Sequence, residues 1–290
     1  MLEGTIIKGI GGFYYVNTIN GIYECRARGK FRKDKIVPTV GDYVKIQIID
    51  DTNKKASLDL IEKRKNILIR PKVANVDIAV IVFAAVSPNI NLDLLDRFII
   101  LVAEQKLDII ICINKIDIDE SEKYKDICDL YKKAGYDVIA MSVKKNIGVD
   151  KLKSKLKNKI SVFAGPSGAG KSSLINSISP LLNVNVGEIS YKIERGKHTT
   201  RHAELMKFDD NSYIVDSPGF TSIDLGHIKS TDLQYYFKEF DSFLEGCKFS
   251  RCSHINEPDC RLKEQIGENV SQIRYDRYVN LFNELKNGKK

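Results

Sequence analysis

The chain of 290 residues contains no tryptophan and only four histidines, and no apolar run approaches the length of a membrane helix. Such a helix needs about 18 or more consecutive apolar residues, so the sequence predicts no transmembrane segment. The N-terminus, MLEGTIIKGIGGF, also lacks the basic, then apolar, then small-residue order of a secretory signal. We therefore expect a soluble, cytoplasmic protein with no membrane partner. Hydrophobic residues make up 43% of the chain, enough for a buried core, and its length leaves room for about two ordinary domains or for one central domain with two smaller attachments.

Cysteine is also scarce, with six in the whole chain. So few argue against a disulfide scaffold. Three of them lie between Cys247 and Cys260, and this crowding suggests metal ligation. The other three, Cys25, Cys112 and Cys128, are isolated and are predicted to be buried as small apolar residues.

Basic residues are in excess, and their distribution is uneven. The net charge is +8 and the pI is about 9.0, which favours an anionic partner. Residues 1–66 contain 13 Lys and Arg against 8 Asp and Glu. Many of these basic residues lie in the segment RARGKFRKDK (Arg26 to Lys35), where Phe31 stands between basic side chains. Taken alone, this segment is either a solvated basic hairpin or a nucleic-acid surface.

Three regions differ in hydrophobic pattern. From Gly4 to about Lys65, short β-rich runs alternate with Gly-Gly, Asn-Gly and Val-Gly-Asp turns, which predicts a small barrel of about five strands and, with the basic loop, an OB-fold. Continuous apolar runs then alternate with amphipathic segments, which indicates a doubly wound α/β sheet. Its strands are expected at 78–86, 108–113 and 137–141, with helices around 95–102, 120–134 and 148–158. From about Leu225 the cysteine cluster precedes a helical tail, in which Tyr278, Leu281, Phe282 and Leu285 share a face.

A phosphate-binding loop is predicted past the middle of the chain. GPSGAGKS (Gly165 to Ser172) fits G-x-x-x-x-G-K-[ST] and lies between the strand ISVFA and the helix SSLINSI. Its glycines let backbone N–H groups face phosphate oxygens, Lys171 reaches the β- and γ-phosphates, and the Ser172 hydroxyl is placed for Mg²⁺. The phosphate-binding residues are Gly165, Pro166, Ser167, Gly168, Ala169, Gly170, Lys171, Ser172 and Ser173.

The base is predicted to be guanine. Asn114-Lys115-Ile116-Asp117 directly follows the predicted strand DIIICI, and ligands bind α/β sheets at such strand ends. A carboxylate at Asp117 can accept two hydrogen bonds from the N1–H and exocyclic amine of guanine, a donor pair that adenine lacks. In MSVKK, after the next strand, Ser142 can brace this loop and the Val143 N–H can approach the guanine O6.

The motifs N-K-x-D, S-x-K, G-x-x-x-x-G-K-S and D-x-x-G occur in an order that is a rotation of the usual GTPase order. The sequence resembles the circularly permuted GTPases of the ribosome small-subunit-dependent type over nearly its whole length. RPKVANVD (Arg70 to Asp77), GKHTTR (Gly196 to Arg201), DSPGF (Asp216 to Phe220) and the terminal Cys/His cluster extend the likeness. Val143 replaces a common alanine and Lys197 a common arginine, and neither change removes a required chemical group.

The resemblance implies an α/β fold made of three domains. These are an OB-fold RNA-binding barrel (1–66), a circularly permuted P-loop GTPase domain (67–224) and a mainly helical zinc-binding domain (225–290). It implies a GTP hydrolase with GTP and GDP as ligands, Mg²⁺ with the nucleotide, and the small ribosomal subunit and its rRNA as partners. We expect a monomer that acts in small-subunit maturation. Because switch II runs directly into the last domain, nucleotide state is expected to move that domain.

The candidate switches carry the remaining nucleotide-site residues. Asp216 and Gly219 belong to D-x-x-G, and Thr200 is the candidate second Mg²⁺ ligand, with Thr199 as the adjacent alternative. Phe220 stands where many GTPases carry a water-orienting glutamine, so His198 or a partner must supply that function. The candidate catalytic residues are His198, Thr200 and Lys171, and a solvent-exposed loop side chain is the alternative for His198.

The terminal cluster is Cys247-x₄-Cys252-x-His254-x₅-Cys260. Three thiolates and an imidazole form the closed tetrahedral set of a structural Zn²⁺, and separate buried cysteines are the alternative. Basic residues in and beyond the cluster are candidates to face RNA phosphates, a solvated helix face being the alternative for the last two: Lys248, Arg251, Arg261, Lys263, Arg274 and Arg277.

Two other functions remain open on sequence grounds. One is a nucleic-acid-binding module whose nucleotide site is a slow sensor without useful turnover. The other is a P-loop kinase or ATPase, against which Asn114 and Asp117 argue because they are suited to guanine.

Overall fold

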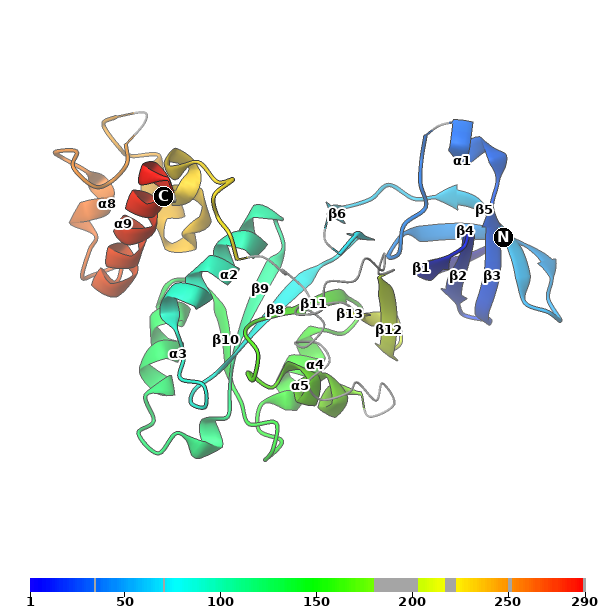
Figure 1. Cartoon of the computed structure of the whole chain (residues 1–290), viewed down its shortest axis with the longest axis horizontal. Coiled ribbons are helices and arrows are strands. Elements are labelled where there is room, and N and C mark those ends of the chain that lie inside the picture. Colours follow the sequence, from blue (N-terminus) through cyan, green and yellow to red (C-terminus); the bar gives the residue numbers. More distant parts are fainter. Residues whose placement is uncertain (34, 70, 180–202, 217–222, 250–251, 289–290) are drawn as a thin grey trace. The chain divides into compact units, whose positions relative to one another are not determined.

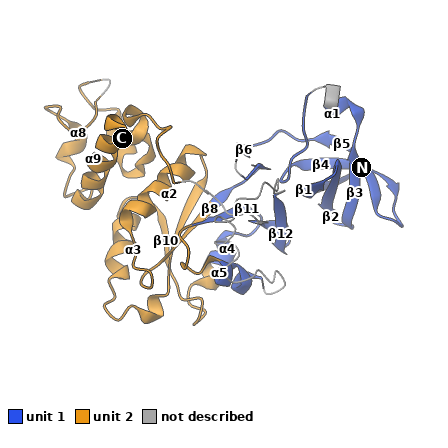
Figure 2. Cartoon of the chain, in the orientation of Figure 1, with its two compact units in different colours: residues 1–78, 152–164, 172–221 blue, residues 79–151, 165–171, 222–290 orange. Residues whose placement is uncertain are grey.

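The computed structural model describes residues 1–33, 35–69, 71–179, 203–216, 223–249 and 252–288; Figure 1 shows the chain. It divides into two compact units, each described by itself below (Figure 2). Unit 1 comprises Met1–Ile78, Leu152–Ala164 and Ser172–Thr221, and unit 2 comprises Ala79–Lys151, Gly165–Lys171 and Ser222–Lys290.

The N-terminal strands close into a barrel in the order β1-β2-β3-β5-β4. They are β1 (Leu2–Ile10), β2 (Phe13–Thr18), β3 (Gly21–Ala27), β4 (Tyr43–Asp50) and β5 (Lys55–Ile61). Only β3 and β5 pair in parallel among the barrel neighbours. Closure of the barrel leaves no edge strand with unpaired backbone N–H and C=O groups. Alternate side chains such as Ile6, Val16 and Leu58 fill the interior and have no exposed area. The expected five-stranded, OB-like barrel is confirmed.

The basic segment after β3 is not a hairpin. It leaves the barrel and forms the short helix α1 (Gly29–Lys33). Phe31 is 5% exposed, so its ring is buried and is not offered for stacking on a base. The Arg28 guanidinium and the Lys30 amine both pair with Asp59. Of the two alternatives for this segment, the hairpin does not describe its backbone, which forms a helical turn around the buried Phe31.

The remaining larger strands follow the order β10-β9-β8-β11-β13-β12. Unit 2 contributes most of β8 (Ile78–Ala84), with β9 (Asp108–Asn114), β10 (Asp137–Ala140), α2 (Leu92–Glu104) and α3 (Tyr124–Lys133). Unit 1 contributes β11 (Ile160–Ala164), β12 (Glu204–Asp209), β13 (Ser212–Asp216) and most of α5 (Lys171–Ile178), while α4 (Val149–Lys155) runs from one unit into the other. Two short strands, β6 (Ile67–Leu68) and β7 (Val73–Ala74), pair with each other.

The strands predicted at 78–86, 108–113 and 137–141 are confirmed as β8, β9 and β10, because burial dictates their composition. Every residue of β8 and β11 is buried, as their continuous apolar runs require. β9 and β10 pair in parallel, and β12 and β13 form an antiparallel pair that ends at Asp216. Cys25, Cys112 and Cys128 are also buried, as expected.

The C-terminal part of unit 2 is made of short helices around an aromatic core. They are η3 (Ser230–Tyr236), η4 (Lys238–Phe240), α7 (Asp241–Leu244), α8 (Arg261–Glu264) and α9 (Gln272–Asn287). Phe237, Phe240 and Tyr278 contact one another with ring centroids 5.0–5.3 Å apart. Tyr278, Leu281 and Phe282 are buried, which confirms the predicted apolar face. Throughout the described residues, no helix combines the length and apolar character that a membrane crossing requires.

A buried charge cluster joins α9 to α2. Arg274 is 1% exposed, donates from Nε to Glu239 Oε1 at 2.6 Å and donates from Nη1 to Asp96. Asp96 also accepts hydrogen bonds from the Tyr131 hydroxyl, at 2.7 Å, and from Arg277 Nε. The prediction that Arg274 and Arg277 could face RNA or solvent is therefore wrong: both are turned inward, toward carboxylates from distant parts of the chain.

Replacement of Asp96 by asparagine is expected to lower the free energy of unfolding of unit 2 by about 3–5 kcal/mol, because it leaves buried guanidinium charge uncompensated. Glu284→Gln is the matched control, since it removes the partner of Arg97 from a partly exposed ion pair, which contributes at most about 1 kcal/mol. Urea unfolding followed by circular dichroism compares them. Equal, small shifts of the two midpoints would show that the buried cluster does not stabilise the fold.

Candidate functional site

The predicted phosphate loop connects β11 to α5 and leaves no room for side chains at two glycines. Gly165 has φ +132°, and a Cβ there would lie 2.1 Å from the Val82 carbonyl oxygen. Gly170 has φ +93°, and a Cβ there would lie 2.4 Å from Asn114 Nδ2. Glycine is therefore required at both positions, by backbone conformation and by space.

Lys171, the first residue of α5, folds back over this loop. Its Nζ donates to the carbonyl oxygens of Gly165 at 2.9 Å and Pro166 at 2.7 Å, and only 8% of the residue is exposed. Burial lowers the pKa of Lys171 to about 8. The ammonium thus lies within the loop that is predicted to bind phosphates, next to the equally buried Ser172.

Asn114 links the phosphate loop to the second base loop. It ends β9 and is 3% exposed. Its Nδ2 donates to the Ala169 carbonyl oxygen at 2.9 Å, and its Oδ1 accepts the Val143 N–H at 3.2 Å. One side chain therefore fixes the spacing between the loops that are predicted to hold phosphate and base. The next residue, Lys115, has φ +62° and donates from Nζ to the Ser87 carbonyl oxygen.

Asp117 lies on the 3₁₀ turn η1 (Ile116–Ile118) and is held by Ser142. The fully buried Ser142 donates from Oγ to Asp117 Oδ1 at 2.6 Å and accepts the Lys145 N–H at 3.1 Å. The hydrogen bond from Ser142 lowers the pKa of Asp117, so the carboxylate stays ionised and able to accept hydrogen bonds. The structure thus brings Asn114, Asp117, Ser142 and Val143 together, all within unit 2.

Most of the candidate switch residues fall in parts of the chain that the structure does not describe. His198, Thr199, Thr200, Gly219 and Phe220 lie outside the described residues. Asp216 is the last residue of β13. Sequence reasoning missed Ser87, which takes part through its carbonyl oxygen; no residue type gives a signal for such a contact.

The four predicted zinc ligands do converge. The Sγ atoms of Cys247, Cys252 and Cys260 and one ring nitrogen of His254 all lie within 4.8 Å of one another. Tetrahedral Zn²⁺ would place two sulfurs about 3.8 Å apart, and a sulfur and a nitrogen about 3.6 Å apart. The Cys252–Cys260 sulfur distance is 3.8 Å, and His254 Nδ1 lies 3.6 Å from the Cys247 sulfur and 3.3 Å from that of Cys260. The residues fit a structural zinc ion.

A second residue orients the histidine. His254 Nε2 lies 2.6 Å from Gln234 Oε1, so the ring donates there and directs Nδ1 toward the thiols. Burial lowers the pKa of His254, which favours the neutral form that binds metals. Gln234 was not predicted, because it lies on η3, 20 residues before the histidine.

The basic residues of this region differ in their surroundings. Lys263 donates from Nζ to the carbonyl oxygens of Ile255 and Glu257, so it braces the loop between the ligands. Lys248 forms an exposed ion pair with Asp259. Arg261 is exposed, and Arg251 lies outside the described residues.

Together, the barrel, the α/β strand order, the loop geometry and the Cys/His cluster define a circularly permuted GTPase with a barrel and a terminal metal-binding region. The model of the RsgA GTPase family matches residues 61–226, and that of the RsgA N-terminal domain matches residues 3–55. The chain belongs to the RsgA GTPase family, and it is a GTP hydrolase.

Relatives match the whole chain. Proteins of Clostridium kluyveri and Caldanaerobacter subterraneus subsp. tengcongensis, both named small ribosomal subunit biogenesis GTPase RsgA, are 47% and 46% identical to this chain. All of this chain is covered in each case, with 100% and 97% of the relatives. Two solved structures have TM-scores of 0.83: YjeQ from Thermotoga maritima (33% identical, 99% of both chains) and YloQ, a circularly permuted GTPase (38% identical, 100% of this chain and 97% of that one).

The metal site predicts about one zinc per chain in protein purified without chelator. Cys252→Ser should lose the zinc and unfold the C-terminal helices while keeping guanine-nucleotide binding, because a structural metal contributes directly to folding. Cys128→Ala is the matched control, since Cys128 is also buried in unit 2 but lies outside the cluster. Elemental analysis and circular dichroism are the readouts. Full zinc occupancy in Cys252→Ser would contradict the ligand set.

The pKa of Lys171 predicts that nucleotide binding takes up a proton above about pH 8. Bound phosphates keep the ammonium charged, whereas the free site loses its proton as the pH rises through 8, so affinity falls by up to about tenfold per pH unit there. Below that pH the amine is charged in both states. Calorimetry at pH 8.5 in two buffers measures the uptake, and Lys171→Arg, which stays charged, is the control. Equal proton uptake by the two proteins would refute this assignment.

Proposed function

We propose that this chain couples GTP hydrolysis to late maturation of the small ribosomal subunit, whose binding stimulates hydrolysis. The observation that carries the proposal is the double contact of Asn114 with the phosphate loop and the second base loop, beside the Asp117–Ser142 pair. This arrangement is suited to guanosine triphosphate. The names of full-length relatives support the ribosomal role.

Guanine selection is assigned to Asp117. Its carboxylate accepts the two guanine donors, and Ser142 keeps it ionised and oriented. The Val143 N–H, which contacts Asn114 Oδ1 in this structure, is placed to share its hydrogen bond with the guanine O6. Lys115, anchored at the Ser87 carbonyl, is assigned to the same base-binding group.

Phosphate binding and hydrolysis are assigned to the second set of predicted residues. The loop from Gly165 to Ser173 binds the phosphates, with the Lys171 ammonium neutralising charge on the β- and γ-phosphates. Ser172 and Thr200 are the proposed ligands of Mg²⁺, which neutralises phosphate charge when bound with GTP. Asp216 and Gly219 sense the γ-phosphate, and His198 orients the attacking water or stabilises developing charge.

RNA contacts are assigned to the barrel and the zinc domain. The exposed basic side chains of residues 1–66 include Arg26 and Lys35. Arg28 and Lys30 instead form ion pairs with Asp59. Exposed cations attract rRNA phosphates without reading sequence. The proposed division of labour is residues 1–66 for RNA binding, 67–224 for GTP, and 225–290 for zinc and docking, in a monomer of the cytoplasm.

Asp117→Asn is expected to weaken GTP binding by about 10³-fold or more and to strengthen binding of xanthosine triphosphate. The amide offers a donor to the xanthine carbonyl, and the charge-assisted pair with guanine is lost. Competition against a fluorescent guanine nucleotide measures both affinities. Asp119→Asn is the control, because Asp119 lies two residues away and instead caps the start of α3. Unchanged GTP affinity in Asp117→Asn would exclude the base-reading role.

Hydrolysis is expected to be slow for the chain alone, on the order of 10⁻⁴ to 10⁻² s⁻¹, because Phe220 cannot orient water. The small subunit should raise the rate by about 10² to 10⁴ by ordering catalytic groups, and His198→Ala should lose that stimulation but keep GTP and subunit affinity. Single-turnover hydrolysis with saturating subunits and without them measures this effect. If the small subunit stimulates the variant as much as wild type, the stimulating group belongs to the ribosome or to another part of the chain.

A further inference from the structure

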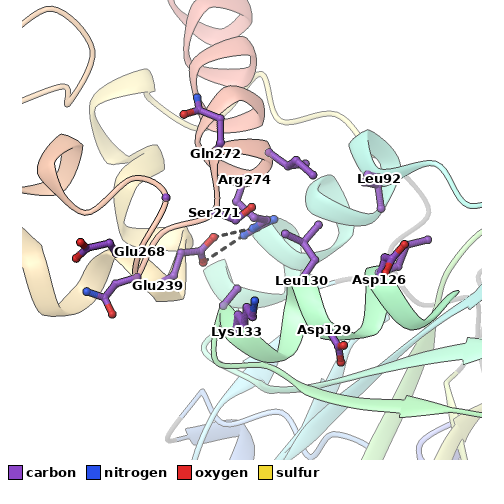
Figure 3. A pocket seen from close by; sticks show the side chains of 15 residues that line it. Leu92, Asp126, Asp129, Leu130, Lys133, Glu239, Glu268, Ser271, Gln272 and Arg274 are labelled. Carbon is purple, nitrogen blue, oxygen red and sulfur yellow. Dashed lines mark hydrogen bonds and ion pairs between the residues drawn. The ribbon is translucent and has the colours of Figure 1, made fainter. Parts of the chain in front are cut away.

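A groove of about 480 Å³ runs between α3 and the N-terminal end of α9, entirely within unit 2 (Figure 3). One wall is formed by α3 and the start of α2, including Leu92, Ile127 and Leu130. The other wall is the turn before α9 and its first residues, where Ile273 is 54% exposed. The groove thus presents aliphatic surface on both sides.

The charges of the groove differ in sign from those of the chain. Its lining includes four acidic side chains and two basic ones, whereas the chain as a whole carries +8: Asp126, Asp129, Glu239 and Glu268 against Lys133 and Arg274. Arg274 and Glu239 neutralise each other at the base, where dashed lines in Figure 3 join them.

Exposed carboxylates lie at the rims of the groove. Asp129 pairs with Lys132 on the surface. Asp126 on α3 and Glu268 on the opposite turn are exposed, and no ion pair to either occurs within the described residues. Lys133, on the same wall as Asp126, is also exposed, so these three side chains leave a net charge of −1, with one exposed carboxylate on each wall beside aliphatic side chains.

We propose that this groove binds a basic, partly aliphatic protein segment of the small ribosomal subunit, whose RNA the barrel is proposed to bind. The inference rests on the proposed ribosomal function. RNA phosphates would be repelled by Asp126 and Glu268, whereas Lys and Arg side chains can lay their methylene stems on Leu130 and Ile273 and reach both carboxylates. A particle made of RNA and basic proteins satisfies both surfaces of this chain.

The test compares two probes, the intact small ribosomal subunit and its rRNA stripped of protein, at one fixed salt concentration. Asp126→Lys and Glu268→Lys are each expected to weaken binding to the intact subunit by about tenfold. The same variants should bind naked rRNA as tightly as wild type or more tightly, because they add positive charge. Asp108→Lys, an exposed residue at the start of β9 outside the groove, adds the same charge as a control and should not weaken either complex.

Opposite outcomes overturn the proposal. Unchanged affinity of both groove variants for the intact subunit shows that no basic segment binds there, and parallel weakening on both probes assigns the groove to RNA. Zinc content and GTP affinity confirm that the variants are folded. If wild type binds neither probe, the proposed ribosomal function itself fails, and this inference falls with it.

Discussion

One side chain, Asn114, links the two loops that are predicted to hold the nucleotide. The amide is buried at the end of β9 and uses its nitrogen on the phosphate loop and its oxygen on the loop after β10. These loops are 55 and 29 residues from Asn114 in sequence. Because a buried amide must satisfy both ends, the loops can adopt only a narrow range of spacings. Gly170 completes the constraint, since a larger residue would displace the amide.

The permuted order places the switch strands last in the GTPase domain, directly before the C-terminal region. The sequence predicts that nucleotide state moves this region. The Arg274–Asp96–Glu239 cluster restricts that idea, because separating α9 from α2 would expose or orphan buried charges at a cost of several kcal/mol. Movement of the C-terminal helices is therefore expected to carry α2 with it. The groove beside this cluster would then keep its shape during the GTPase cycle.

Much of the fold could be predicted because local patterns match global burial. Turn pairs and alternation locate the barrel, continuous apolar runs locate β8 and β11, fixed spacing locates the phosphate loop, and crowded cysteines locate the Cys/His cluster. Arg274 could not be predicted, since nothing local distinguishes an arginine that faces solvent from one that meets Asp96 of a distant helix. Ser87 contributes through its backbone, and Gln234 becomes relevant only once η3 packs beside His254.

The central claim is that permuted loops assemble one guanine-specific site, and nucleotide competition tests it most directly. Wild-type protein is loaded with a fluorescent guanine nucleotide and Mg²⁺, and unlabelled GTP and ATP are titrated against it. GTP is expected to displace the probe at a concentration about 10³-fold or more below that of ATP, because adenine lacks the N1–H donor that guanine offers to the Asp117 carboxylate beside its amine. Equal displacement by ATP would contradict the account.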